Sequence, residues 1–188
     1  MVDGQRPSSE AIAKILEAEG GSKRLLSALV RDDGVAMFGG PVIYEYFDSL
    51  HDGPKMFPPS GDARWAALRL FGLGEGMFDS ADLRVVEMRR PDGERSPEAI
   101  ARYQQAVVRG LDRLEEEAPG FAGFHIGLIS IAGVLMWIDW LSATRGNQDE
   151  WRLGRPKLAS WYAGFVDRPS YQRRASLHPT GPAPPPKT

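Results

Sequence analysis

The architecture of this chain is set by residues 28–50, which read ALVRDDGVAMFGGPVIYEYFDSL. Two apolar runs, Ala28-Leu29-Val30 and Val35–Phe38, flank the dipeptide Asp33-Gly34. Asp-Gly between apolar runs predicts a hairpin with a tight turn, because both central residues tolerate positive φ. We therefore expect two short antiparallel strands at this point of the chain.

A helix is predicted directly after the hairpin. Gly39-Gly40-Pro41 opens it, since Pro41 suits the first helical position. The apolar residues at helical spacing, expected on one face, are Ile43, Phe47 and Leu50. Before Ser27 the sequence predicts only a short helix, Ala11–Glu19, and shows no apolar strand run.

The rest of the chain has helical periodicity. Residues 51–61 are rich in Pro and Gly and form the predicted linker between domains 1–50 and 62–177. The first long helix is expected near 62–87, with an inner side made of Trp65, Leu68, Phe71 and Leu83. Residues 178–188 contain five prolines and are expected to form a disordered tail.

Three further helices are predicted after the first. Ser96 caps one that ends at Pro119-Gly120, a fully buried one starts at Ile126, and a third starts at Pro156 and is stopped by Pro169. The run 115–117, all Glu, is interpreted as a solvated helix end. At the start of the buried helix, His125 can accept a backbone hydrogen bond but Leu128 cannot complete a capping box, so a weak start is expected.

Composition narrows the functional classes. The chain has 23 basic and 25 acidic residues with a net charge of −2, which argues against a nucleic-acid binder. It has no cysteine, so disulfides and thiolate sites are excluded, and its three histidines show no HxxxH or HxH pairing for a metal. The longest apolar run, Ile126–Ile138, is shorter than the roughly 18 residues of a membrane span. The start lacks the apolar core of a secretory signal, so we expect a cytoplasmic protein.

Four strings carry a family resemblance: PVIYEYFD at 41–48, MFPPSG at 56–61, ARWAAL at 63–68 and WRLGRP at 151–156. In this order and spacing they resemble the soluble, cytosolic glutathione transferases over about Ser27 to Leu177, and the last string resembles the closing helix of many bacterial members. The resemblance implies a mainly α fold (α/β overall), in which an all-helical C-terminal domain follows a partial thioredoxin-like N-terminal domain. It also implies a dimer.

The resemblance places the glutathione site in the front half, and this half departs from the family pattern. The family's first βαβ unit needs about 30 residues, so the first strand and its catalytic residue are expected to be absent before Ser27. Ser27 stands at the family's cis-proline position, and a cis bond before a non-proline residue costs about 3–4 kcal/mol, so we expect it to be trans. The loop leading to Ala28 should then present different backbone groups.

Two further glutathione positions are implied by the resemblance. The acidic residue and the Ser that hold the γ-glutamyl part in the family fall at Gly39-Gly40, which have no side chains to offer. Glu75 stands where related proteins often carry an acid that reaches a glutathione amine across the dimer, although a solvated helix carboxylate explains it equally well. The weak catalytic candidates are the hydroxyls of Ser27 and Tyr44.

An apolar pocket for a small co-substrate is the last candidate site, lined by Met77, Phe78, Leu83 and Trp137, unless these residues simply form core. The first functional hypothesis is a glutathione-transferase-like protein with weakened or lost conjugation, acting by small-molecule binding or by dimerisation with itself or a related transferase. The alternative is an active enzyme that conjugates glutathione to an electrophilic apolar substrate. A third reading is an eroded product without a function. Glutathione is the one cofactor implied, and the shortened front half is expected to expose apolar surface.

Overall fold

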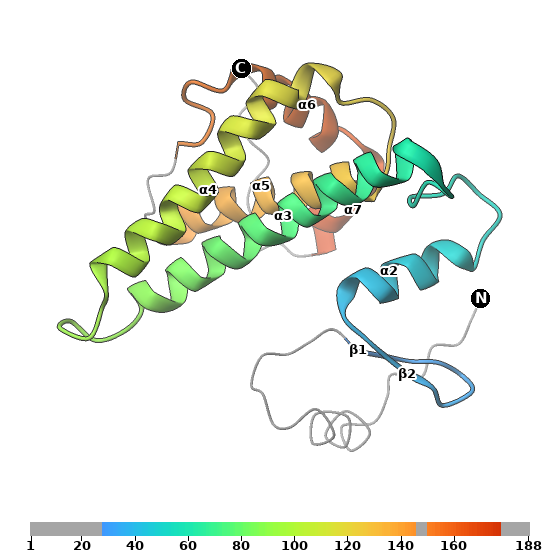
Figure 1. Cartoon of the computed structure of the whole chain (residues 1–188), viewed down its shortest axis with the longest axis horizontal. Coiled ribbons are helices and arrows are strands. Elements are labelled where there is room, and N and C mark those ends of the chain that lie inside the picture. The colour runs from blue at the N-terminus through green and yellow to red at the C-terminus, as the bar shows by residue number, and fades with distance from the viewer. Residues whose placement is uncertain (1–27, 146–149, 178–188) are drawn as a thin grey trace. The chain divides into compact units, whose positions relative to one another are not determined.

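The computed structural model describes residues 28–145 and 150–177 (Figure 1). The predicted helix Ala11–Glu19, Ser27 and the tail 178–188 lie outside the described residues. The chain divides into two compact units, Met1–Phe57 and Pro58–Thr188, and the division falls inside the stretch 51–61.

The first unit contains the predicted hairpin. Strand β1 (Ala28–Val30) pairs antiparallel with β2 (Ala36–Phe38), so that Leu29 lies opposite Met37. The connection differs from the expected two-residue turn: the Arg31 carbonyl accepts from Gly34 N–H at 2.9 Å, and Arg31 N–H donates to the Val35 carbonyl at 3.0 Å. This is a three-residue loop in which a turn is followed by a left-handed glycine, since φ is 82° at Gly34.

The physical reason for this loop is the side chain of Asp33. Its Oδ1 accepts a hydrogen bond from the Val35 N–H at 3.1 Å, and its Oδ2 lies 2.7 Å from Arg31 Nη2. An Asp that bonds the backbone two residues ahead stabilises a turn without entering the left-handed region. Among the described residues, only glycines have positive φ.

Helix α2 (Gly40–Ser49) follows, with Pro41 in its first turn as predicted. Ile43 is buried, whereas Phe47 and Leu50 are 50% and 61% exposed, so the predicted apolar face is covered only at Ile43. A two-stranded hairpin is too narrow to cover more than one stripe of a helix. The exposed large apolar side chains of this unit are Val35, Phe38, Val42, Tyr44, Phe47 and Leu50. They confirm the expectation of uncovered apolar surface.

A buried carboxylate holds the segment after α2. Asp48, which is 7% exposed, accepts hydrogen bonds from the backbone N–H groups of Met56 at 2.7 Å and Phe57 at 3.0 Å. The Lys55 ammonium donates to the Asp48 carbonyl at 2.7 Å. Burial by itself raises the pKa of the Asp48 carboxyl, but the two backbone bonds and the nearby cations outweigh it, so the pKa is lowered.

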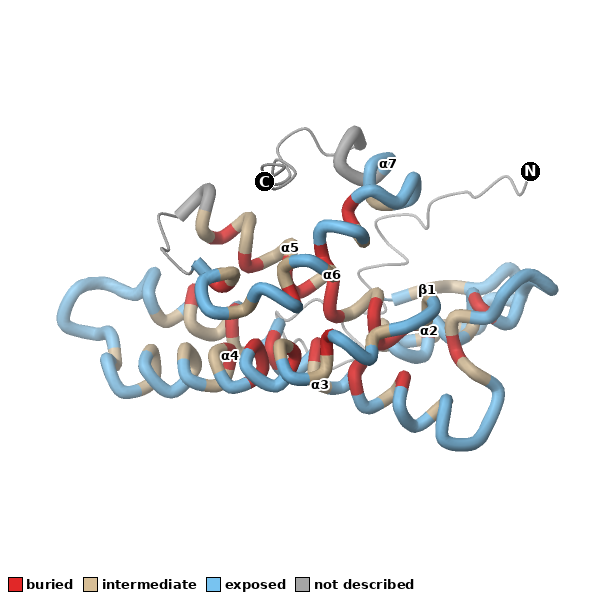
Figure 2. Tube along the Cα trace, turned by 90° about the horizontal axis from the view of Figure 1, so that it is seen from above, coloured by how far each residue is buried: buried red, intermediate tan, exposed pale blue. Residues whose placement is uncertain are grey.

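The described part of the second unit consists of α3 (Gly61–Met88), α4 (Pro97–Glu117), α5 (Ile126–Arg145), α6 (Pro156–Val166) and α7 (Pro169–Leu177), with a single 3₁₀ turn at Ala118–Gly120. Figure 2 shows buried positions alternating with exposed ones along α3 and α4, while α5 carries the densest buried stretch. Ser96 caps α4 as predicted, because its Oγ accepts from Ala99 N–H at 3.1 Å.

Three predictions in this unit need correction. Trp65 is 67% exposed, so it does not belong to the inner side of α3, whereas Phe71 is buried there. Pro169 does not merely stop α6, which ends at Val166; it starts α7, a position suited to proline. The His125 Nδ1 is buried without a hydrogen-bond partner among the described residues, so it does not cap α5, and burial lowers its pKa.

The Glu run at the end of α4 is not a solvated end. The Glu115 carboxylate accepts from the backbone N–H groups of Lys157 and Leu158, at 3.2 and 2.8 Å, and so caps α6 from another helix. The Glu117 carboxylate takes both Arg69 Nη atoms, at 2.9 and 2.6 Å, and these bonds lower its pKa. The sequence prediction failed here because both partners are more than 40 residues away.

Candidate functional site

The start of α2 has no side chains that can bind a ligand. Gly39 precedes the helix with φ 83° and ψ 130° and makes no side-chain cap. Its carbonyl accepts the first helical bond from Ile43 N–H at 3.2 Å. A helix start attracts anions through its free N–H groups, but Pro41 has none, so one of these donors is missing.

Tyr44 lies against this helix start. A Cβ placed on Gly40 would be 3.1 Å from the Tyr44 hydroxyl oxygen and 3.2 Å from the ring atoms Cε2 and Cζ. The edge of the phenol ring thus occupies the space next to Gly40, while the side chain remains 46% exposed. Of the other predicted positions in this unit, Ala28 is exposed at the start of β1, and Ser27 lies outside the described residues.

Glu75 belongs to the second unit, on α3. It is exposed and shares a helix face with Asp79, one turn further on. Partial burial, followed by the negative charge of Asp79, raises the pKa of the Glu75 carboxyl. The carboxylates of Glu75 and Asp79 therefore repel each other.

The residues predicted to line an apolar pocket separate into two groups. The Phe78 and Trp137 rings lie 5.2 Å apart, and Trp137 stacks on Trp140 at 4.6 Å with an interplanar angle of 17°. Met77 is buried on the α4 side, since a Cβ on Gly110 would be 2.5 Å from its sulfur. Leu83 is half-buried.

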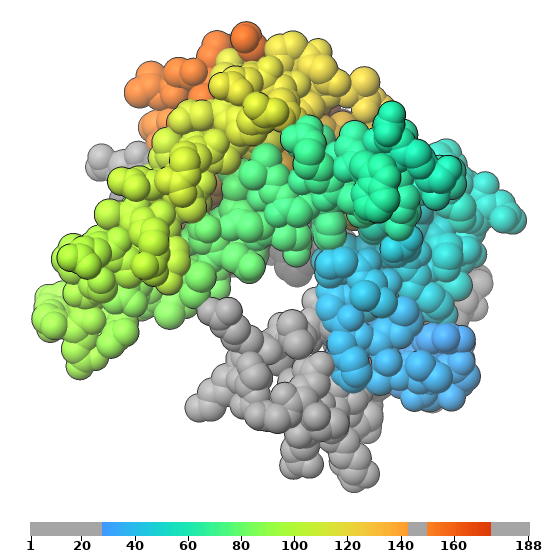
Figure 3. All heavy atoms as spheres, in the orientation of Figure 1, coloured from blue at the N-terminus to red at the C-terminus, as the bar shows by residue number. Residues whose placement is uncertain are grey.

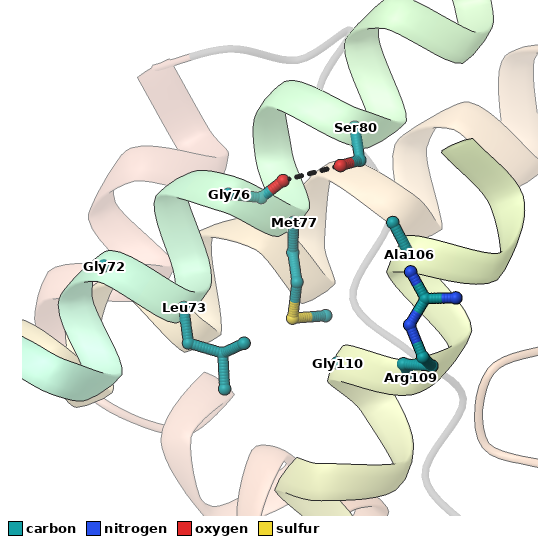
Figure 4. A pocket seen from close by; sticks show the side chains of 8 residues that line it. All are labelled: Gly72, Leu73, Gly76, Met77, Ser80, Ala106, Arg109 and Gly110. Atoms are coloured by element: carbon teal, nitrogen blue, oxygen red, sulfur yellow. Dashed lines mark hydrogen bonds between the residues drawn. The ribbon is translucent and has the colours of Figure 1, made fainter. Parts of the chain in front are cut away.

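A shallow groove of about 320 Å³ runs between α3 and α4, whose side chains meet along the face seen in Figure 3. Figure 4 shows the groove with Met77 reaching toward Gly110 and the Ser80 hydroxyl bonded to the Gly76 carbonyl. The groove is lined by Gly72, Leu73, Gly76, Met77, Ser80, Ala106, Arg109 and Gly110. A Cβ on Gly72 or Gly76 would meet no atom within 4 Å, so the α3 side of the groove is open.

Arg109 projects from α4 at this groove (Figure 4). Within residues 28–145 and 150–177 it forms no hydrogen bond or ion pair. The same described residues contain no group of three His, Asp or Glu side chains that could hold a metal ion. None of their helices combines the length and the apolar character needed to cross a membrane.

Comparison with known proteins finds glutathione transferases among the similar structures. A structure of a glutathione transferase family member from Pseudomonas fluorescens Pf-5, with bound S-(propanoic acid)-glutathione, matches with a TM-score of 0.73 and 29% identity over 93% of each chain. A glutathione S-transferase from Methylobacillus flagellatus KT with bound GSH matches with a TM-score of 0.71 and 27% identity, over 83% of this chain and 75% of that one.

The chain has the glutathione transferase fold and is similar in sequence to glutathione transferases over most of its length.

A curated protein agrees with this assignment: the uncharacterised GST-like protein YibF of Escherichia coli K12 is 24% identical over 149 residues, which are 77% of this chain and 72% of that protein. No protein-family model matches the chain. The glutathione transferase fold was predicted correctly: the hairpin and α2 belong to the thioredoxin-like part, and α3–α7 form the helical part.

Two features of this protein were missed by the sequence reasoning. Trp140 follows Trp137 by three residues, and Tyr44 follows Gly40 by four. Both spacings bring side chains together on one helix face, so both contacts had a readable signal.

Proposed function

We propose that this protein is a glutathione-transferase-like protein with weakened or lost glutathione conjugation, which acts by binding small molecules or by dimerisation. The observation that supports the proposal is that the start of α2 has no side chains that can bind a ligand. The two positions where the family holds the γ-glutamyl part are Gly39 and Gly40. Losing a hydrogen bond to a charged group costs about 1.5–3 kcal/mol, which weakens binding by about tenfold or more for each bond.

The backbone strengthens this argument. Gly39 has φ 83°, a conformation that costs an ordinary L-residue about 1–2 kcal/mol. An acidic residue would therefore be strained at this position, and a side chain at Gly40 would press on Tyr44.

The test combines a conjugation assay with a titration. Purified full-length protein is assayed with reduced glutathione and 1-chloro-2,4-dinitrobenzene, and glutathione binding is followed by calorimetry into the millimolar range. We expect turnover near the uncatalysed background and weak or undetectable binding. Turnover in the ordinary enzyme range, roughly 1–10³ s⁻¹, would contradict the proposal.

A restoring variant sharpens the test. Gly40→Ser combined with Gly39→Asp returns both missing side chains and should strengthen glutathione binding, by less than two hydrogen bonds to charged groups would give, because the backbone at position 39 and the contact with Tyr44 oppose these side chains. Gly93→Asp is the matched control, since Gly93 also has positive φ, at 89°, and open space around it, but lies in the loop after α3. Equal binding by the two variants would mean that the start of α2 does not limit affinity.

Dimerisation is the second part of the proposal, and the groove between α3 and α4 supports it. Its α3 side is open at Gly72 and Gly76, which allows another helix to approach closely. Arg109 carries an unpaired positive charge, and Glu75 with Asp79 presents uncompensated negative charge on the adjacent helix. In a symmetric dimer, each Arg109 would meet the acids of the other copy.

Charge reversal tests the dimer surface. Arg109→Glu is expected to shift sedimentation from dimer toward monomer, because it sets like charges against each other across the interface. Arg89→Glu, at the end of α3, has the same charge change away from the groove and should leave the assembly unchanged. A wild-type protein that sediments as a monomer at all concentrations would contradict the dimer, and with it this surface. A related transferase as the partner, and the cytoplasm as the location, remain predictions from the sequence.

The alternative function, an active transferase with a hydroxyl that stabilises the thiolate, is not favoured by any described feature. Ser27 lies outside the described residues. The Tyr44 hydroxyl lies at the start of α2, where the family holds the γ-glutamyl part rather than the thiol.

A further inference from the structure

A second groove lies in the helical unit, at the start of α6. Its volume is about 480 Å³, which is within the range of sites that bind ligands. The lining combines two prolines and a half-buried tryptophan ring with two polar side chains. The residues of this groove, called the α6 groove below, are Ala118, Pro119, Pro156, Lys157, Ser160 and Trp161.

The Trp161 ring is held in position by other aromatic rings. Phe121 meets it edge-on, with ring centroids 5.2 Å apart, and the Phe165 ring lies 5.5 Å away. Part of Trp161 remains accessible, since the residue is only half-buried. A ring that is already fixed loses little conformational entropy when a ligand packs on it. The α6 groove therefore offers a preformed apolar surface.

Two hydrogen-bond donors at the α6 groove are unused. Neither the Lys157 ammonium nor the Ser160 hydroxyl makes a hydrogen bond or an ion pair within residues 28–145 and 150–177. Both residues are exposed. An ammonium group can only donate hydrogen bonds, and a hydroxyl can donate one. A ligand that suits this groove therefore combines apolar groups with free hydrogen-bond acceptors.

A proline-rich segment has this chemistry. Such segments adopt the polyproline II conformation, whose backbone carbonyls have no internal partners, and they bind to grooves lined by aromatic rings. Residues 178–188 of this chain read HPTGPAPPPKT and contain five prolines, none of which has an N–H to donate. This tail is rich in acceptors and apolar rings, whereas the α6 groove supplies donors and an aromatic surface.

The tail begins close enough to reach the α6 groove. It follows α7, whose Tyr171 ring lies 6.5 Å from the Phe165 ring, which in turn lies 5.5 Å from Trp161. From Tyr171 the helix continues to Leu177, a rise of about 9 Å. Residues 179–186 in the polyproline II conformation would span about 25 Å. The tail is therefore long enough to return from the end of α7 to the start of α6.

We propose that residues 178–188 dock in the α6 groove, with proline rings packed on Trp161 and backbone carbonyls bound by Lys157 and Ser160. The proposal departs from the composition-based expectation of a disordered tail, and it does not depend on glutathione binding. Because the tail is tethered, its effective concentration at the groove is on the order of millimolar. A contact with a Kd of about 1 mM is then occupied about half of the time.

A fluorescent label on the tail of the full-length protein tests the docking. The chain has no cysteine, so Lys187→Cys provides a single thiol for bimane, a fluorophore that tryptophan quenches on contact. If the tail is docked about half of the time, Trp161→Phe should raise the fluorescence of the label about twofold. Trp65→Phe is the matched control, because Trp65 is 67% exposed on α3 and does not line the α6 groove. The control should leave the fluorescence unchanged.

Dilution of the labelled protein distinguishes the possible occupants. A tail that docks on its own chain is quenched equally at all protein concentrations. Quenching that disappears on dilution would show that the tail binds a second copy, and would overturn the proposal. A groove that serves only the proline-rich segment of another protein would leave the label unquenched. The Trp161 and Trp65 variants would then be equally fluorescent, which also overturns the proposal.

A second measurement needs no label and leaves the groove intact. The tail variant combines Pro184→Gly, Pro185→Gly and Pro186→Gly, which removes the residues that favour polyproline II. In ¹⁵N-labelled full-length protein, this variant should shift the Trp161 indole N–H resonance and leave that of Trp65 in place. An unshifted Trp161 resonance would overturn the proposal even if Trp161→Phe fails to fold.

Discussion

Gly127→Ala is expected to destabilise the second unit because α3 crosses α5 at this glycine. A Cβ at Gly127 would lie 2.4 Å from the Ala67 carbonyl oxygen and 2.8 Å from the Leu70 Cβ. Neither atom is at the end of a flexible side chain, so the two helices must move apart. The Ala67 and Leu70 positions are buried, which leaves no nearby space for this movement.

The magnitude follows from two opposing effects. Overpacking a core costs about 1–3 kcal/mol, while replacing Gly by Ala in a helix returns about 0.8–1.0 kcal/mol. With a backbone oxygen as the obstacle, we expect a net loss of about 2 kcal/mol. Gly133→Ala is the control on the same helix, because its Cβ would meet no atom within 4 Å. That variant should gain up to about 1 kcal/mol.

Urea unfolding followed by tryptophan fluorescence measures this difference. All five tryptophans lie after residue 57, so the signal reports the second unit, to which α3 and α5 belong. The two variants should differ by about 2–3 kcal/mol, with equal dependence on urea concentration. If Gly127→Ala is as stable as Gly133→Ala, the helices do not cross as closely as the structure indicates, and the packing argument is refuted.

Three further predictions concern buried or partly buried carboxylates. Because the pKa of Asp48 is lowered, its contribution to stability is complete above the ordinary value of 3.8 and is lost as the pH falls through the folded value. The protection of the Phe57 amide, measured as its hydrogen exchange relative to that of an unstructured peptide at the same pH, should therefore fall in acid, and already at neutral pH in Asp48→Asn. Asp139→Ala leaves the Trp151 indole N–H and the Arg152 guanidinium without their shared acceptor, and should cost about 2–3 kcal/mol in urea unfolding. Glu115→Ala removes the cap of α6 and should cost about 1 kcal/mol, whereas exposed Glu116→Ala should be neutral within about 0.5 kcal/mol.

A specific experimental result would contradict each of these three predictions. Slow exchange at Phe57 in the Asp48→Asn variant would show that the segment after α2 is held by other contacts. An Asp139→Ala variant with wild-type stability would mean that the ion pair with Arg152 only balances its desolvation cost. Equal stabilities of the Glu115 and Glu116 variants would remove the capping role from Glu115.

The hairpin shows which local features can be predicted from the sequence and which cannot. Alternating apolar runs around Asp33-Gly34 predicted two strands, and both are present. The turn type was wrong because it depends on whether Asp33 enters the left-handed region or bonds the Val35 N–H. Both arrangements satisfy the same residue preferences, so a local pattern does not distinguish them.

Some features of the candidate site can be predicted from the sequence, and others need the structure. The bare glycines at the start of α2 are visible in the sequence, and so is the spacing of Phe78 and other apolar residues on α3. The sequence does not show which residues Met77 and Phe78 contact, because both are apolar neighbours on one helix. Only the partners that pack against α3, namely Gly110 on α4 and Trp137 on α5, separate core from surface.

The sequence by itself determined the family resemblance, the mainly helical fold and the absence of ligand-binding side chains at Gly39 and Gly40, because these depend on residue types and on periodicity along the chain. The tertiary structure alone decided that Glu115 caps a helix more than 40 residues away. It also decided that Gly127 marks the closest approach of two helices. These features depend on which surfaces meet in space, and the energy of such a contact belongs to both partners rather than to either residue.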